Sequence, residues 1–311
     1  MTPLRVAVKQ YLTLRRQLGF KLNEAARALP QFVTFMEQHH APAITSKLAQ
    51  EWAQQCSTVQ PVTWAHRLSF VRQFARCRSA VDPRTEIPPE GLLPYRPKRA
   101  RPYIYSAKEI QRLLRAALKL SSGKGLRPWV YYCLLGLLSV TGLRLGEACN
   151  LQLQDVDLKA GLLTIRGAKN GKSRLVPLHR STCRVLSDYL TRREHTWAGR
   201  AISSYLFVSN WGNRLDAGSL HRTFYALSRQ IGLRGPTDSC GPRLHDLRHR
   251  FAFLTLLRWY RAGDDAERRL PILSTYLGHV HINDTFWYLR DWPELMREAM
   301  ARLERCWEGR S

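Results

Sequence analysis

The feature that most constrains the fold is a run of 12 mostly apolar residues, Trp129 to Val140, between Arg127 and Arg144. A membrane-spanning helix needs about 18 to 20 such residues, so this run is too short to cross a bilayer. A helix that is apolar on nearly every side is buried on nearly every side, so the run predicts a central helix with other elements packed around it. At 311 residues, the chain is long enough for about two domains.

The charge of the chain indicates its kind of partner. There are 49 Lys and Arg against 24 Asp and Glu, a net charge of +25, while 44% of the residues are hydrophobic, which excludes a disordered chain. The first 100 residues carry 15 basic and 6 acidic side chains, a net +9, and the remainder carries +16, so the excess is not a tail. A folded protein with this self-repulsion is typical of polyanion binders. We expect a nucleic acid, with a basic membrane-surface or ribosome-associated protein as the alternative.

The cysteines and the N-terminus indicate the compartment. Seven cysteines are scattered without a Cys-x-x-Cys pair, which favours reduced thiols over a disulfide framework. The first residues, MTPLRVAVKQ, lack the apolar segment of a signal peptide. We therefore expect a cytoplasmic protein associated with the nucleoid, without a membrane anchor.

The first predicted domain, residues 1–92, has the periodicity of short helices. These are expected at 6–18, 23–38, 45–55 and 61–79. The last of them places basic side chains among aromatic ones and is either a solvated face or a surface laid on a phosphate backbone. The candidates for DNA contact on it are Arg67, Arg72 and Arg76.

Residues 93–105 are predicted to be an extended linker, because they combine prolines with closely spaced positive charges. Its candidate DNA contacts are Arg96, Lys98, Arg99 and Arg101. Ser106 and Glu109 then have the spacing of a capping box, which opens a helix and a second domain over residues 106–290.

The second domain is predicted to be helical with one β-hairpin. Helices are expected at 128–140, 145–151, 181–193, 218–231, 245–260, 266–277 and 283–289. Two strand-like runs, 162–165 and 174–178, flank an Asn-Gly turn, the strongest short hairpin signal. A final helix covers residues 291–311. The predicted fold class is mainly α with a small antiparallel β-sheet.

His245 and Arg248 lie three residues apart on a predicted helix and so share a face. A cation beside an imidazole suits a phosphate better than a core. His245 and His249 have the spacing of a zinc-binding His-Glu-x-x-His helix, but Asp246 replaces the glutamate, no third ligand is obvious, and Arg248 would repel a dication. We therefore expect no metal.

Three further clusters could carry chemistry. Thr-Gly-Leu-Arg144 follows the central helix, with Glu147 one turn on to hold the guanidinium, although an ordinary surface ion pair has the same spacing. Lys169 lies at the predicted hairpin turn, where a lysine is most often simply solvated. Leu-Gly-His279 ends a helix and is followed nine residues later by Tyr288.

Together these motifs resemble the tyrosine recombinase (phage integrase) family, in order and spacing, over roughly residues 102–290. The family's patterns are TGLR-x-x-E, a lysine in a hairpin turn, HDLRH, and LGH with a downstream tyrosine. The turn here has one residue more than the usual pattern, so Lys169 and Lys172 are both candidates and Lys169 is preferred. The long stretch between Arg248 and His279 is similar to that in transposon-associated integrases.

The resemblance implies that DNA strands are cut and rejoined through a covalent 3′-phosphotyrosine, without cofactor. It assigns the nucleophile to Tyr288 and the leaving-group proton to Lys169. His245 would accept a proton, and Glu147 and Asp246 would support the site. Arg144 and Arg248 would neutralise the phosphate as charge builds in the transition state, and His279 would orient it. Lys172 and Arg174 are further candidate DNA contacts.

The expected partners are double-stranded DNA and three further copies of the chain, since two duplexes need four sites; sister recombinases could join them. The expected function is integration or transposition of a mobile element. Tyr260 and Tyr276 remain alternative nucleophiles. A type IB topoisomerase-like enzyme and a non-catalytic DNA-binding partner remain alternative functions. The target sequence is not visible in the chain, because readout depends on groove contacts and DNA shape.

Overall fold

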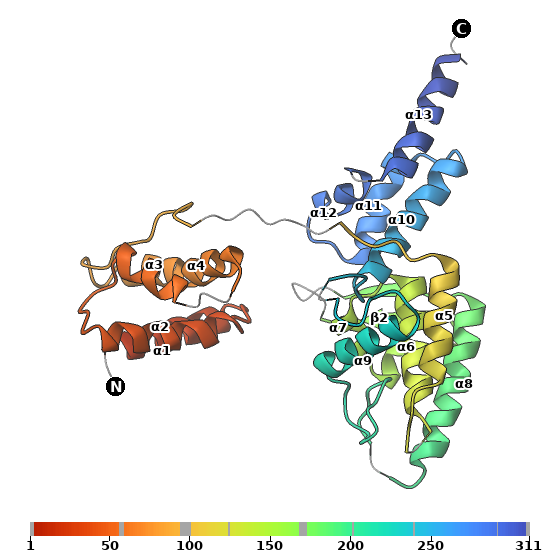
Figure 1. Ribbon diagram of the computed structural model, residues 1–311, viewed down its shortest axis with the longest axis horizontal. Coiled ribbons are helices and arrows are strands. Elements are labelled where there is room, and N and C mark those ends of the chain that lie inside the picture. Colours follow the sequence, from red (N-terminus) through yellow and green to blue (C-terminus); the bar gives the residue numbers. More distant parts are fainter. Residues whose placement is uncertain are drawn as a thin grey trace. The chain divides into compact units, whose positions relative to one another are not determined.

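A computed structural model of the chain describes residues 3–55, 59–93, 101–123, 125–167, 173–200, 202–238, 240–290 and 292–308, with only the backbone at 287–290 and 306. The chain divides into two compact units, Met1–Ala100 and Arg101–Ser311 (Figure 1). Residues 94–100, which hold most of the predicted linker, lie outside the described ranges, whereas residues 101–105 belong to the second unit.

The described part of the first unit is helical, as predicted. Its helices are α1 (Pro3–Gln17), α2 (Ala25–Gln38), α3 (Ser46–Gln54) and α4 (Pro61–Arg78). Thr45 caps α3 by accepting a hydrogen bond from the Leu48 amide at 3.2 Å, and Pro61 begins α4, where a missing amide hydrogen costs nothing. Phe32 and Trp52 meet edge to face at the centre of this unit, with ring centroids 5.2 Å apart. Tyr11 of α1 and Phe74 of α4 belong to the same buried cluster, so all four helices contribute to one core.

The second unit contains the remaining elements. They are α5 (Ala107–Leu118), α6 (Arg127–Thr141), α7 (Leu145–Asn150), the 3₁₀ turn η1 (Leu153–Asp155), β1 (Val156–Asp157), β2 (Leu162–Ile165), β3 (Arg174–Pro177), α8 (Arg180–Trp197), α9 (Ala217–Gln230), α10 (Asp246–Arg261), α11 (Ala266–Leu277), α12 (Asn283–Arg290) and α13 (Pro293–Glu308). The types and order of the predicted helices are confirmed, with shifts of a few residues at their ends.

Helix α6 is the predicted central helix. It packs against α5, α8 and α10, and its side chains are buried along most of its length, Leu134 and Leu138 among them. Ser106 and Glu109 form the predicted capping box at the start of α5. The buried apolar run therefore organises the unit, because every helix beside it must turn an apolar face toward it.

The sheet has three antiparallel strands in the order β1-β2-β3, with Ile165 opposite Arg174 at the end of the hairpin nearest its turn. The short strand β1 was not predicted, because two residues are too few for a period-two pattern. The turn residues 168–172, and with them Lys169 and Lys172, lie outside the described residues.

Helix α13 packs on α10, with Leu295 and the preceding Trp292 buried beside Phe253. Further along α13, Glu298 pairs with Arg261 at 3.0 Å, and Arg302 donates to the carbonyl oxygen of Asp264. The C-terminal end of α13 extends away from the rest of the unit (Figure 1). Met296, Met300 and Leu303 are exposed on this helix. None of the described helices is both long enough and apolar enough to span a bilayer.

Candidate active site

Arg144 is positioned by the abrupt end of α6. Gly142 ends that helix with a left-handed φ of +63°, and Arg144 follows as the first flanking residue of α7. A Cβ at position 142 would lie 2.6 Å from Cδ1 of Phe251, so only glycine fits this turn. The chain therefore makes a tight turn between α6 and α7, and this turn fixes the backbone position of Arg144.

The Arg144 side chain is held by a carboxylate and a carbonyl. Nη1 donates to Oε1 of Glu147 at 2.9 Å, and Nη2 donates to the carbonyl oxygen of Gly278 at 2.9 Å. The backbone amide of Arg144 donates to Oε2 of Glu147 at 3.0 Å. The side chain of Arg144 is 27% exposed, against 8% for Glu147. The predicted support of Arg144 by Glu147 is therefore present in the structure, and the guanidinium keeps an open edge.

Arg174 contacts the same carboxylate from a different element. Its Nη1 and Nη2 donate to Oε1 and Oε2 of Glu147 at 3.0 and 2.7 Å, and its Nε donates to the carbonyl oxygen of Tyr276 at 2.7 Å. Burial acts to raise the pKa of Glu147, but the hydrogen bonds from Arg174 and from the Arg144 amide outweigh it and lower the pKa to about 2. Glu147 is thus a permanent anion between two guanidinium groups.

Arg248 lies deeper than Arg144. It is 2% exposed, and its Nη1 and Nη2 donate to the carbonyl oxygens of Gly142 and Leu277 at 2.8 and 2.7 Å. These carbonyls belong to the ends of α6 and α11, so Arg248 ties both helix ends to α10. The motifs predict that Arg248 neutralises the phosphate; in the structure its guanidinium is buried between the ends of α6 and α11.

His245 and His249 lie side by side at the start of α10, with ring centroids 4.7 Å apart. Desolvation of the ring and the charge of Arg248 lower the pKa of the His245 imidazole to about 4, although the residue keeps an exposed surface. Burial and the neighbouring His245 lower the pKa of His249 to about 3. Both rings are therefore neutral near pH 7, which leaves His245 able to accept a proton.

Asp246 contacts the residues just before α10. It is 1% exposed and accepts hydrogen bonds from the backbone amide and the side chain of Arg243, the latter through Nη2 at 2.8 Å. These bonds hold the turn before α10 and so fix the point at which that helix begins.

His279 follows the end of α11 and is oriented by α12. Its Nδ1 lies 2.8 Å from Oγ1 of Thr285, whose side chain is fully buried. Burial and the charge of Arg248 lower the pKa of His279 to about 4. Tyr288 lies three residues after Thr285 on the same helix, but its side chain is outside the described part of the chain. The role of Thr285 was missed by sequence reasoning, since a threonine between two motif residues carries no distinctive pattern.

The sequence profile of the phage integrase family matches residues 104–294, the stretch that holds every motif above. The chain belongs to the phage integrase family. It is a tyrosine recombinase, a site-specific DNA strand transferase, as the motifs predicted.

Individual relatives support this placement. The chain is 64% identical to y4rB of Sinorhizobium fredii, named as an integrase/recombinase, over the full length of both. It is 32% identical to the tyrosine recombinase XerA of Pyrococcus furiosus over 53% of this chain and 52% of that protein.

Solved structures confirm the fold class. A crystal structure of XerA recombinase covers 97% of this chain and 98% of its own, with 25% identity and a TM-score of 0.51. The Tn1549 transposon integrase, solved with transposon right end DNA, covers 96% and 98% with 16% identity and a TM-score of 0.66, which shows a shared fold.

Among the alternative tyrosines of this recombinase, Tyr276 stacks on Phe251 with centroids 5.3 Å apart and planes at 19°. Its burial raises the pKa of the phenol to about 12. Burial likewise raises the pKa of Tyr260. Both phenols are therefore poorer sources of phenolate than an exposed tyrosine.

The three candidate DNA contacts on α4 already have protein partners. Arg72 donates to the carbonyl oxygens of Pro88 and Pro89 at 2.7 and 2.8 Å, so it pins the segment after α4. Arg76 pairs with Glu90 at 2.9 Å on the surface, and Arg67 lies over the Trp52 ring. In the second unit, Arg101 lies 5.9 Å from the Trp292 ring centroid. Arg96, Lys98 and Arg99 fall outside the described residues.

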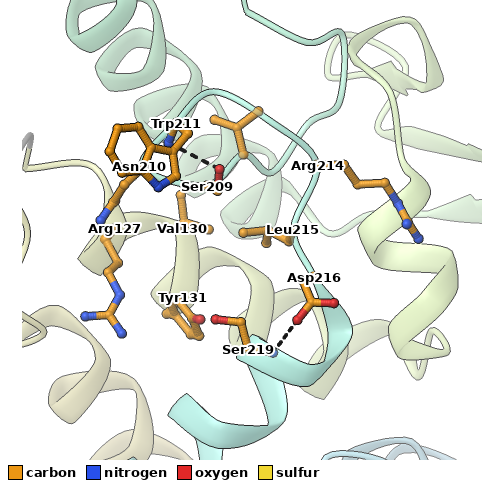
Figure 2. A pocket seen from close by; sticks show the side chains of 11 residues that line it. Arg127, Val130, Tyr131, Ser209, Asn210, Trp211, Arg214, Leu215, Asp216 and Ser219 are labelled. Carbon is orange, nitrogen blue, oxygen red and sulfur yellow. Dashed lines mark hydrogen bonds between the residues drawn. The ribbon is translucent and has the colours of Figure 1, made fainter.

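A pocket of about 310 Å³ lies in the second unit between the first turn of α6, the turn around Trp211, and the start of α9 (Figure 2). Trp211 is 82% exposed at its rim, and Asp216 caps α9 by accepting from the Ser219 amide at 2.7 Å. None of the residues that line this pocket belongs to the family motifs. In the described ranges, no group of three or more His, Cys, Asp or Glu side chains is placed to hold a metal ion.

Proposed function

We propose that the recombinase cleaves and rejoins DNA through a covalent link between Tyr288 and a 3′-phosphate, in the integration or transposition of a mobile element. The observation that carries this proposal is the clustering of two guanidinium groups and two neutral imidazoles at the ends of α6 and α11. Arg144, Arg248, His245 and His279 come from three separate segments of the sequence, and hydrogen bonds to the carbonyls of residues 142, 277 and 278 bring the two arginines together.

The two arginines act at different depths. Arg144 has an open edge and contacts the non-bridging oxygens directly, while the buried Arg248 adds positive charge from beneath and holds the cluster rigid. A phosphodiester gains negative charge in its pentacoordinate transition state, and fixed cations in a site of low dielectric stabilise that charge most.

The proposed step exchanges one phosphodiester for another. The Tyr288 oxygen bonds to phosphorus, the bond from phosphorus to the 5′-oxygen breaks, and a 3′-phosphotyrosine and a 5′-hydroxyl result. His245, neutral at pH 7, accepts the phenol proton, and Lys169 supplies the proton to the leaving 5′-oxygen. Because the bond energy is kept in the protein–DNA link, rejoining needs no nucleotide.

Assembly on DNA is the second part of the proposal. Two duplexes exchanging strands need four copies of the chain, or copies of the chain with sister recombinases. The exposed apolar side chains of α13, Met300 and Leu303 among them, are suited to contact a neighbouring copy. Since the substrate is DNA, we place this activity at the nucleoid in the cytoplasm.

Covalent trapping tests the nucleophile. The full chain is incubated with a randomised pool of nicked duplexes, and DNA that stays attached under denaturing conditions is recovered and sequenced. We expect an adduct with the wild type and with Tyr276→Phe and Tyr260→Phe, and none with Tyr288→Phe. An adduct that survives Tyr288→Phe moves the nucleophile elsewhere, and binding without any adduct favours a non-catalytic partner.

A further inference from the structure

The side chain of Arg174 connects three elements that carry different motifs. It is the first residue of β3, directly after the hairpin turn that holds Lys169. Two of its nitrogens bind Glu147, at the start of α7, and its Nε binds the carbonyl oxygen of Tyr276, near the end of α11. One guanidinium thus spans the hairpin, the Arg144 motif and the segment before His279.

The side chain of Arg174 is mostly enclosed and lies close to the backbone of Gly278. Its side chain is only 10% exposed, so it is poorly placed to lie on a DNA backbone. A Cβ at Gly278 would lie 2.8 Å from Nη1 of Arg174, and Gly278 has a left-handed φ of +66°. The glycine before His279 therefore serves both the turn and the close approach of this guanidinium.

The charges explain what Arg174 does for Arg144. Glu147 is an anion shared by the two arginines, so the group of three carries one net positive charge. Without Arg174, the described guanidinium partner left to Glu147 is Arg144, and a fully paired Arg144 has less charge to offer a phosphate. The bidentate geometry also fixes the carboxylate, and through it the direction of Arg144.

We propose that Arg174 is a positioning residue for strand cleavage: it takes up the charge of Glu147 and leaves Arg144 available to the phosphate. This inference rests on the proposed role of Arg144 at the phosphate. It replaces the sequence-based expectation that Arg174 contacts DNA.

The test compares Arg174→Met, Arg174→Lys and the double variant Arg174→Met with Glu147→Gln in the full chain. The substrate is a nicked duplex recovered by covalent trapping with the wild type. Two quantities are measured: the rate of adduct formation at saturating DNA, and the dissociation constant at several salt concentrations. Arg115→Met, which removes an exposed charge of the same kind from the last turn of α5, is the matched control.

We expect Arg174→Met to slow adduct formation about 10- to 100-fold with an unchanged dissociation constant, because misplaced reacting groups cost rate and not affinity. Arg174→Lys keeps the charge without the bidentate contact, so its rate of adduct formation should lie between those of the wild type and Arg174→Met. Adding Glu147→Gln to Arg174→Met should recover part of the rate, since Arg144 is then no longer drawn to an anion.

Other outcomes overturn the proposal. A weaker dissociation constant with a smaller salt dependence and a normal saturated rate makes Arg174 a phosphate contact. A double variant no faster than Arg174→Met rejects the charge-sharing role. If Arg174→Met does not fold, Arg174→Lys decides, and a wild-type rate in that variant rejects the proposal.

Failure of the proposed function is recognised separately. If the wild type traps no duplex, the cleavage role of Tyr288 fails, and an NMR pH titration of His279 then tests Arg174. The Arg174 charge contributes to the low pKa of His279, so Arg174→Met should raise that pKa and Arg115→Met should not. An unchanged titration places Arg174 outside the cluster.

Discussion

The Nδ1 of His279 and the Oγ1 of Thr285 lie 2.8 Å apart, and Thr285 is fully buried. This hydrogen bond joins the segment that accepts Arg144 and Arg248 to the helix that carries Tyr288. The orientation of His279 thus depends on the helix that carries the proposed nucleophile.

Thr285→Val should slow strand cleavage about tenfold or more while DNA binding stays unchanged, because the isosteric side chain no longer fixes the His279 ring. Thr285→Ser keeps the hydroxyl and serves as the control. The measurement is the rate of adduct formation at saturating DNA, with the ¹⁵N shifts of His279 as a second readout. A normal rate with altered His279 shifts would show that ring orientation does not limit cleavage.

Gly142→Ala should destabilise the second unit by about 1–3 kcal/mol, because it places a Cβ at positive φ against Phe251. Gly146, inside α7, has open space around the position that a Cβ would take, and Gly146→Ala should be neutral or stabilising by up to about 1 kcal/mol. Urea unfolding of both variants checks this pair. Equal stabilities would contradict the tight turn before Arg144.

Acid should destabilise the protein between about pH 6.5 and 4. The pKa values of His245, His249 and His279 are lowered in the folded chain to about 4, 3 and 4, so the unfolded chain binds more protons as the pH falls through 6.5. Their stabilising effect is complete above that pH and is lost toward pH 4 for His245 and His279 and toward pH 3 for His249. Glu147, with a folded pKa of about 2, stabilises the folded chain fully above about pH 4.5, and this stabilisation is lost as the pH falls toward 2.

Urea midpoints at pH 7, 6 and 5 measure the histidine window without interference from Glu147. His249→Phe should flatten the dependence in that range, because it removes one of the three groups. A midpoint that does not move between pH 7 and 5 would show that the imidazoles are not desolvated in solution.

Met300→Glu combined with Leu303→Glu should leave the folded monomer as stable as the wild type, because both side chains are exposed on α13. Assembly of four copies on paired DNA sites should be lost, since a charge replaces the proposed apolar contact. Glu304→Gln on the same helix is the control, and analytical ultracentrifugation with DNA is the measurement. Normal assembly by the double variant would remove α13 from the interface.

Binding to any duplex DNA should weaken steeply as salt rises, because the net charge of +25 is spread over both units and phosphate contacts release counterions. A titration of duplex DNA at about 50 to 200 mM salt should show a fall of about 10³-fold or more if at least about six phosphates are contacted. A flat salt dependence would contradict the charge-based prediction of the partner.

Local sequence predicted most elements because their signals are local. The apolar run before Thr141, the capping box at Ser106 and the Asn-Gly turn each act within a few residues. The first two are found where they were predicted, and the strands on either side of the Asn-Gly turn pair as predicted, although the turn itself lies outside the described residues. The order of the motifs along the chain was enough to predict the family, since that order can be read without knowledge of the tertiary structure.

What the sequence by itself determined is therefore the type and order of the helices and of the β2-β3 hairpin, the basic character and the family. Only the tertiary structure decided how similar side chains divide the work. Arg144 and Arg174 are chemically identical, yet one keeps an open edge and the other is buried against Glu147 and Tyr276. That difference arises where α7, β3 and α11 meet, because a charge is defined by its neighbours in space, and those neighbours here lie 27 and 102 residues from Arg174.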